Sequence, residues 1–199
     1  MMRNNNVIAV TGGIGSGKST FCALLQDKGF PVFSCDKIYA ELLAEGRLND
    51  SLRNAFPECF DEKGLNRRAL AEAVFANERK LYALNEITHP EILRELFSRA
   101  EKFPFCFAEV PLLYEEGLEN FFDGVIALRR NRKKRICAVK QRDGISEQEV
   151  EQRIARQFPE DRLEEKECIL LENDGTLSDL SKKADEAIQL LKNKFPFRF

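Results

Sequence analysis

The stretch VTGGIGSGKSTF, residues 10–21, holds four glycines, a lysine and two hydroxyl side chains directly after the last glycine. Residues 7–10 form a short apolar run of the kind found in buried parallel strands. Residues 19–28 place apolar side chains at helical spacing, with Gly29 as a stop. In this context Gly12–Ser19 matches G-x-x-x-x-G-K-[ST], which predicts a phosphate-binding loop between a strand and a helix.

The residue types of this loop suit a triphosphate on magnesium. Glycine permits backbone angles closed to other residues, so successive N–H groups can converge on phosphate oxygens. The helix that begins near Lys18 adds the positive end of its dipole. We expect Lys18 to reach the β- and γ-phosphates and the Ser19 hydroxyl to bind Mg²⁺. The residues expected to bind ATP here are Gly13, Ile14, Gly15, Ser16, Gly17, Lys18, Ser19 and Thr20.

Five short apolar runs alternate with helical segments along the chain. This alternation predicts an α/β fold with a doubly wound, parallel, five-stranded sheet of the P-loop kinase type. The helical stretch between the second and third runs is too long for one crossover helix, so part of it should form a cap. We expect it to break near residues 57–64 and again before His89-Pro90, where Thr88 would cap a new helix. The runs are residues 7–10, 31–33, 105–108, 125–128 and 169–171.

We expect one P-loop kinase domain over residues 1–199, made of a core and two helical additions. The first addition is an acceptor-binding cap and the second is a charged lid. The lid begins with the basic run Arg129–Arg135, six positive charges in seven residues, each of them either solvated or in contact with ATP phosphates. The expected bounds are about 1–35, 103–128 and 168–199 for the core, about 36–102 for the cap and about 129–167 for the lid.

The composition is that of an ordinary globular protein, with 43% hydrophobic and 32% charged residues among 199. A net charge of −2 gives no general attraction to nucleic acid or anionic lipid. No apolar run approaches the ~20 residues of a membrane span, and the start of the chain shows no signal-peptide pattern. Six cysteines without a C-x-x-C pair fit reduced thiols. We expect a cytoplasmic monomer or small homo-oligomer with neither nucleic-acid nor membrane partners.

Further segments, in chain order, carry a resemblance to a known family. After the phosphate loop come CDKI (35–38), GLNRRALAEAVFAN (64–77), LNEITHPEI (84–92), VPLLYEEGLENFFD (110–123), RDGISEQEVEQRIARQ (142–157) and ENDGTL (172–177). Together they cover most of the chain and resemble the successive signatures of dephospho-CoA kinases. The resemblance implies transfer of the γ-phosphoryl group of ATP to the ribose 3′-hydroxyl of dephospho-CoA, which gives coenzyme A and ADP.

Asp36 follows the second strand, on the side where an α/β sheet presents its ligands. A carboxylate there can accept a hydroxyl proton and orient the oxygen toward the γ-phosphorus. The resemblance implies that Asp36 is this base, while a helix-capping role is the plainer alternative. With Asp36, the residues implied to be catalytic are Lys18 and Arg142.

The acceptor is expected to meet residues of the cap and of the segment after the third strand. By the resemblance, Arg67 binds the substrate pyrophosphate, which suits a planar guanidinium. His89 lies in the family's cap, although a structural role fits it better. Leu112, Leu113 and Tyr114 are expected to line the acceptor groove. Glu115 either holds sugar hydroxyls or pairs with an arginine.

Two further sets of residues are expected to serve the nucleotide. Glu109 ends the third strand, where P-loop enzymes often place an acid near the water shell of the metal. By the resemblance, Arg142 and then Arg153 are lid arginines that approach the γ-phosphoryl group, and Asn173 lies in a loop against adenine. The sequence departs from the family pattern at Leu128–Asn131, at Ala138, where the family has arginine, and at Glu167-Cys168, where it has Ala-Asp. These departures concern the lid.

Two other functions stay open at this point. One is a kinase for another nucleoside or nucleotide, and the other is a nucleotide-dependent binding protein whose basic run contacts RNA or DNA. A GTPase is disfavoured because the guanine-reading N-K-x-D is absent; residues 193–196 read Asn-Lys-Phe-Pro.

Overall fold

The computed structural model describes residues 6–195, which fall into two compact units. One unit, here the sheet unit, holds the described residues up to Ser34 and from Ala100 onward. The other, the helical unit, is Cys35–Arg99. The expectations for the first five residues of the chain lie outside the described residues. No helix of residues 6–195 is long and apolar enough to span a membrane.

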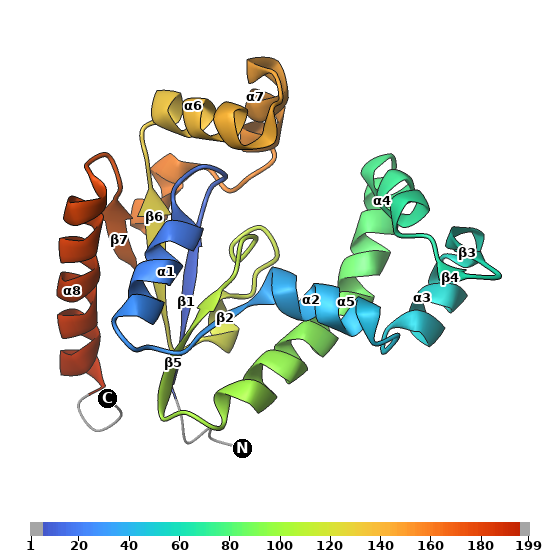
Figure 1. The fold of residues 1–199 in the computed structure, drawn as a ribbon, viewed down its shortest axis with the longest axis horizontal. Coiled ribbons are helices and arrows are strands. Elements are labelled where there is room, and N and C mark those ends of the chain that lie inside the picture. Colours follow the sequence, from blue (N-terminus) through green and yellow to red (C-terminus); the bar gives the residue numbers. More distant parts are fainter. Residues whose placement is uncertain (1–5, 196–199) are drawn as a thin grey trace. The chain divides into compact units, whose positions relative to one another are not determined.

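A parallel five-stranded sheet is the centre of the sheet unit (Figure 1). The strand order is β2-β5-β1-β6-β7, and every pairing within it is parallel. The α/β fold and the five strands expected from the apolar runs are therefore confirmed. The strands are β1 Asn6–Gly12, β2 Val32–Ser34, β5 Phe105–Glu109, β6 Gly124–Arg129 and β7 Ile169–Glu172.

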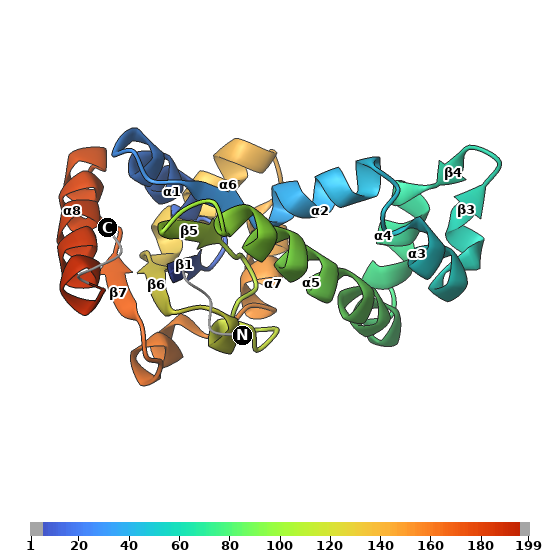
Figure 2. The same ribbon diagram turned by 90° about the horizontal axis from the view of Figure 1, so that it is seen from below.

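Helices α1 (Lys18–Asp27) and α8 (Leu177–Lys194) pack side by side against one face of this sheet (Figures 1 and 2). Successive side chains of a strand point to opposite faces of the sheet, so every second residue of each strand points toward these two helices. The larger apolar side chains of the strands meet the two helices in one buried cluster. It includes Ile8, Val10, Phe105, Phe107, Ile126, Leu128, Phe21, Leu25, Leu180 and Ile188. This packing fixes the loop between β1 and α1 at the carboxyl edge of the sheet.

The segment after β6 is helical, as expected. It contains α6 (Arg132–Asp143), α7 (Glu147–Ala155) and the 3₁₀ helix η3 (Glu160–Glu165). Ile136, Val139 and Val150 form a small core between α6 and α7, and Ile14 of the phosphate loop packs against it. A shorter 3₁₀ helix, η2 (Glu119–Phe121), precedes β6.

The helical unit consists of short elements and one long helix. A two-stranded antiparallel hairpin between residues 60 and 65 was not expected from the sequence. The elements are α2 Cys35–Ala44, α3 Asn49–Ala55, η1 Pro57–Cys59, β3 Phe60–Asp61, β4 Gly64–Leu65, α4 Arg67–Phe75 and α5 Glu78–Ala100.

The expected break before His89-Pro90 is wrong, because α5 continues through both residues. Thr88 is buried within the helix and is therefore not its cap. A proline inside a helix removes one hydrogen bond and costs about 3 kcal/mol. Burial of Leu93, Leu96 and other apolar residues of the same helix offsets that cost. The helix changes direction along its length (Figures 1 and 2), as proline-containing helices do.

Candidate active site

The phosphate loop joins β1 to α1 and takes backbone angles that demand glycine. Gly15 and Gly17 have φ of 75° and 98°, in the left-handed region. Gly17 also has no room for a side chain, since a Cβ there would lie 2.2 Å from Nδ2 of Asn173. Helix α1 starts at Lys18, so its positive dipole end faces the loop. The loop geometry is thus set by both backbone conformation and close packing.

Lys18 lies against the phosphate loop itself. Its Nζ donates to the carbonyl of Gly12 at 2.6 Å and to that of Gly13 at 3.2 Å. These carbonyls belong to the first residues of the motif, so the ammonium lies alongside the backbone that forms the predicted cradle. A phosphate entering the cradle meets a positive charge already held in place.

Ser19 and Glu109 come together at the carboxyl edge of the sheet. The Ser19 hydroxyl donates to Oε1 of Glu109 at 2.7 Å. Glu109 is the last residue of β5, which lies next to β1 with Val10 opposite Glu109. The pKa of the nearby Cys22 thiol is raised to about 12 by burial and by the charge of Glu109, and Lys18 partly offsets this shift. The charges of Lys18 and Glu109 therefore both act on this thiol, in opposite directions.

Asn173 supports the loop from the other side. It is buried, and its Nδ2 donates to the carbonyl of Ser16 at 2.8 Å. Its own N–H donates to the carbonyl of Arg129, which ties the end of β7 to the end of β6. Ser16 is fully buried, so its place among the residues that bind ATP stays a prediction. Asn173 thus shapes the loop directly, and its expected place against adenine stays a prediction.

The segment after β5 holds the residues expected to line the acceptor groove. Leu113 is fully buried, and its role in the groove stays a prediction. Tyr114 is also buried, with its ring against Phe158 at a centroid distance of 5.1 Å, and its role likewise stays a prediction. Glu115 accepts the N–H of Phe158 at 2.8 Å, so one carboxylate oxygen is engaged by backbone rather than by an arginine. Leu112 is 44% exposed and is therefore the most accessible of the three predicted groove residues.

The two expected lid arginines share one carboxylate. Arg142 and Arg153 both bond to Asp143, at 2.7 Å and 3.2 Å, and both are more than half exposed. The hydrogen bond from Arg142 is the main reason why the pKa of Asp143 lies below its usual range. Asp143 therefore holds the two arginine side chains close to each other.

Comparison with known proteins decides the family. The family model for dephospho-CoA kinase matches residues 6–179. A curated dephospho-CoA kinase of Thermus thermophilus is 38% identical over 178 residues, which are 88% of this chain and 87% of that protein. The chain belongs to the dephospho-CoA kinase family.

Solved structures agree with the family assignment. A crystal structure from Thermus thermophilus has a TM-score of 0.83 at 35% identity and covers 94% of this chain and 98% of its own. The dephospho-CoA kinase from Campylobacter jejuni has a TM-score of 0.68 at 27% identity, covering 97% and 99%. The family expected from the motifs is confirmed, and with it an ATP-dependent kinase.

The helical unit holds the other residues that the family resemblance implicates. Asp36 is the second residue of α2, and β2 ends two residues before it. A carboxylate in a first helical turn also stabilises the helix dipole, so its capping role is compatible with this position. Arg67 is the first residue of α4, is exposed, and acts electrostatically on Tyr39. His89 lies inside α5.

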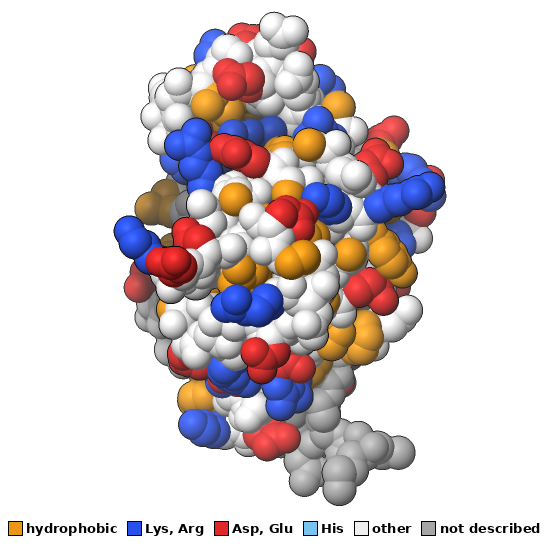
Figure 3. Space-filling view, turned by 90° about the vertical axis from the view of Figure 1, so that its right-hand side faces the viewer, with side chains coloured by type: hydrophobic (Ala, Val, Ile, Leu, Met, Phe, Trp, Pro, Cys, Tyr) orange, Lys and Arg blue, Asp and Glu red, His pale blue; other side chains and the backbone are white. Residues whose placement is uncertain are grey.

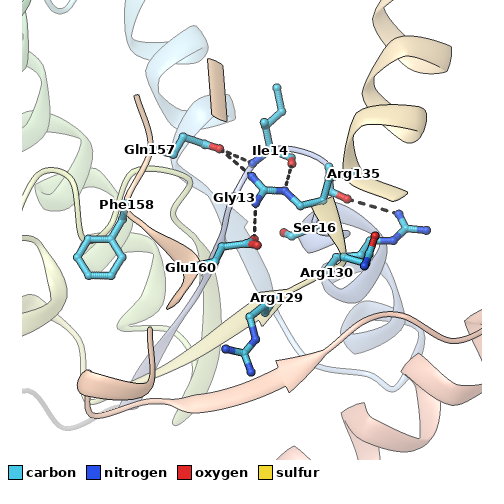
Figure 4. Close-up of polar contacts among 12 residues, drawn as sticks. Gly13, Ile14, Ser16, Arg129, Arg130, Arg135, Gln157, Phe158 and Glu160 are labelled. Carbon is cyan, nitrogen blue, oxygen red and sulfur yellow. Dashed lines mark hydrogen bonds and ion pairs between the residues drawn. The ribbon is translucent and has the colours of Figure 1, made fainter. Parts of the chain in front are cut away.

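Three residues at the two ends of the lid were missed by the motif analysis. Arg135 contacts the phosphate loop, Gln157 and Glu160, and Gln157 also contacts the loop (Figure 4). Arg135 was counted only as one of a basic run, yet its side chain is 3% exposed. Its neighbour Ile136 and Val139 begin a helical apolar stripe, which is the one signal that this end of α6 faces inward.

Proposed function

We propose that this chain transfers the γ-phosphoryl group of Mg²⁺-bound ATP to the ribose 3′-hydroxyl of dephospho-CoA, giving coenzyme A and ADP as the last step of coenzyme A synthesis. The observation that carries the proposal is a complete phosphate loop, with Lys18 and the Ser19–Glu109 pair in place, in a member of this family. Phosphoryl transfer needs positioning and charge stabilisation more than covalent chemistry, and these residues supply both.

In the proposed reaction, Asp36 accepts the proton of the acceptor hydroxyl as that oxygen bonds to the γ-phosphorus. The bond from the γ-phosphorus to the oxygen it shares with the β-phosphate breaks, and ADP leaves. Lys18 and the loop N–H groups stabilise the charge on the phosphate oxygens. Arg142 and Arg153 approach the transferred group from the lid, and Arg67 holds the acceptor pyrophosphate.

The residues present fit a magnesium ion. Mg²⁺ prefers oxygen ligands, keeps several waters, and is commonly held by one or two protein groups plus substrate phosphates. The Ser19 hydroxyl would bind it and the Glu109 carboxylate would hold a water of its shell. Among residues 6–195 no group of three or more acidic, His or Cys side chains is arranged for a metal, in keeping with an ion that arrives with ATP. When bound, Mg²⁺ offsets the charge of the β- and γ-phosphates.

The two helical segments have separate proposed roles. The helical unit, within the expected bounds of about 36–102, would bind the acceptor, and the lid of about 129–167 would cover ATP. A lid that brings its arginines onto the γ-phosphoryl group only when both substrates are bound limits hydrolysis of ATP by water. We further propose a cytoplasmic location and a monomer or small homo-oligomer.

A coupled ADP-release assay tests the function directly. ADP should appear rapidly with ATP, Mg²⁺ and dephospho-CoA together, and only slowly when dephospho-CoA is left out. Mass spectrometry should find the product heavier than dephospho-CoA by one phosphoryl group. Preferred use of uridine, AMP or shikimate in the same assay would instead support a different kinase on this fold.

The nucleic-acid-binding alternative loses its main support in the structure. Four of the six basic side chains in the run 129–135 pair with carboxylates, namely Arg129, Arg132, Lys134 and Arg135. On the face shown in Figure 3, Lys and Arg side chains are interspersed with Asp and Glu. Strong, salt-dependent RNA binding without phosphorylation of any acceptor would be needed to revive this alternative.

A Glu109→Gln variant tests the magnesium assignment. Mutation of a residue that binds a metal ion through another ligand typically lowers metal affinity 10- to 100-fold. The Mg²⁺ concentration that gives the half-maximal rate should therefore rise about tenfold. Titration of Mg²⁺ at saturating ATP measures this shift. Glu101→Gln, which alters an exposed glutamate before β5, is the matched control and should leave the titration unchanged. An unaltered Mg²⁺ dependence in Glu109→Gln would contradict the assignment.

A further inference from the structure

Ile14 lies in the middle of the phosphate loop, and the lid contacts its N–H, its carbonyl and its side chain. Its N–H donates to Oε1 of Gln157 at 2.7 Å, and its carbonyl accepts from Nε of Arg135 at 2.8 Å (Figure 4). Its side chain packs against the small apolar core between α6 and α7. The lid therefore contacts the loop at Ile14 by two hydrogen bonds and by apolar packing.

Arg135 is the centre of these contacts. Its side chain is 3% exposed, and a buried guanidinium is tolerated only when its N–H groups find partners. One terminal nitrogen lies 2.7 Å from a carboxylate oxygen of Glu160, and the other donates to Gln157 at 3.3 Å. Because guanidinium is planar and multidentate, one side chain can tie the loop carbonyl to both lid residues.

Close packing makes the fit between loop and lid tight. A Cβ on Gly13 would lie 2.2 Å from a terminal nitrogen of Arg135, and a Cβ on Gly15 would lie 2.8 Å from the Arg135 carbonyl. Gly13 has no positive φ, so its backbone would accept alanine. The absence of a side chain at Gly13 therefore serves the approach of Arg135 rather than a backbone angle.

The three residues stand at opposite ends of the lid. Arg135 lies in the first turn of α6, whereas Gln157 and Glu160 follow α7. Both stems of the segment that carries Arg142 and Arg153 are thus joined to the same residue of the phosphate loop, Ile14. Any change of the loop on binding phosphate is passed to both stems at once.

We propose that Arg135, Gln157 and Glu160 form a clamp that couples occupancy of the phosphate loop to the position of the lid. They are positioning residues, since they act through Ile14 rather than on the reacting atoms. Binding of ATP orders the loop, the clamp transmits this order to the lid, and the lid arginines are aligned. The proposal rests on ATP being the ligand of the loop, as in the proposed function.

Hydrogen exchange with ATP alone is the decisive experiment, since it does not depend on the acceptor. In the unaltered chain, ATP should slow exchange both in residues 12–20 and in the lid helices, residues 136–155. In Gln157→Met, which keeps the bulk but removes the acceptor of the Ile14 N–H, the lid should lose most of its ATP-dependent protection. Gln157→Glu keeps an acceptor oxygen and should retain it.

Kinetics provide a second readout that a merely structural residue would not produce. Arg135→Gln and Gln157→Met should raise the KM for ATP about tenfold and leave the KM for dephospho-CoA within about twofold. Arg132→Gln, on the same helix with a side chain 60% exposed, is the matched control and should change neither. Gly13→Ala should raise the KM for ATP about as much as Arg135→Gln does. A double variant that carries both substitutions should have the same KM for ATP as Arg135→Gln alone.

Two results would overturn the clamp. One is full ATP-dependent protection of the lid in Gln157→Met, and the other is an equal rise of both KM values. If Arg135→Gln does not fold, hydrogen exchange of the Gln157→Met and Gln157→Glu variants still tests the clamp. If dephospho-CoA proves not to be the acceptor, the exchange experiment remains valid, so failure of the clamp and failure of the proposed function are distinguishable.

Discussion

An Asp36→Asn variant is expected to lower kcat about 10²- to 10⁴-fold, the range that a positioned general base contributes. Asparagine keeps the shape of the side chain but cannot accept the proton of the acceptor hydroxyl. Binding of ATP should be nearly unaffected, because Asp36 is not part of the phosphate loop that binds ATP. The measurements are ADP release at saturating substrates and calorimetric titration with ATP.

The matched control for this variant is Asp50→Asn, an exposed aspartate in the first turn of α3. If Asp36 only stabilised the dipole of α2, the two variants would behave alike, each losing about 0.3–1 kcal/mol of stability and little rate. Near-normal turnover in Asp36→Asn would remove the base assignment. Turnover of Asp50→Asn should equal that of the unaltered chain.

A Lys18→Ala variant is expected to lower kcat/KM about 10²- to 10³-fold, as loss of a preorganised charge at a developing anion typically does. The physical reason is the position of Nζ, which is held at the carbonyls of Gly12 and Gly13 alongside the predicted phosphate cradle. The loss should appear both as weaker ATP binding and as a slower chemical step, since the charge serves the bound and the reacting phosphate. Initial rates over an ATP series separate the two effects.

Lys182→Ala, an exposed lysine of α8, controls for the loss of a surface charge and should leave kcat/KM unchanged. Retention of more than about a tenth of the native kcat/KM in Lys18→Ala would contradict the proposed role. It would mean that the loop N–H groups and Mg²⁺ suffice to hold the triphosphate.

Local features of the sequence predicted much of the fold. The strands β1, β5, β6 and β7 and the helix α1 lie where their apolar patterns placed them, within one or two residues. The helix continuing through His89 and Pro90 shows the limit of this approach. Proline is an unfavourable helix residue locally, but burial of the surrounding apolar face outweighed it.

The residues after β5 show a second limit. The apolar run Leu112–Tyr114 is compatible with either a ligand-binding groove or the protein core. The residue types alone do not say whether a ligand or other parts of the chain will cover these side chains. Packing against Phe158, more than 40 residues later, placed Tyr114 inside. Burial of Leu113 was decided in the same way, by neighbours that the local pattern does not contain.

The phosphate loop was determined by the sequence alone, because its glycines, lysine and serine are contiguous and act through backbone angles and spacing. Only the tertiary structure decided which distant groups meet it. Ser19 meets Glu109 because β5 pairs with β1, and Ile14 meets Arg135 and Gln157 because both lid stems fold back on the loop. Such contacts depend on strand order and on the packing of whole elements, and no short stretch of sequence specifies either.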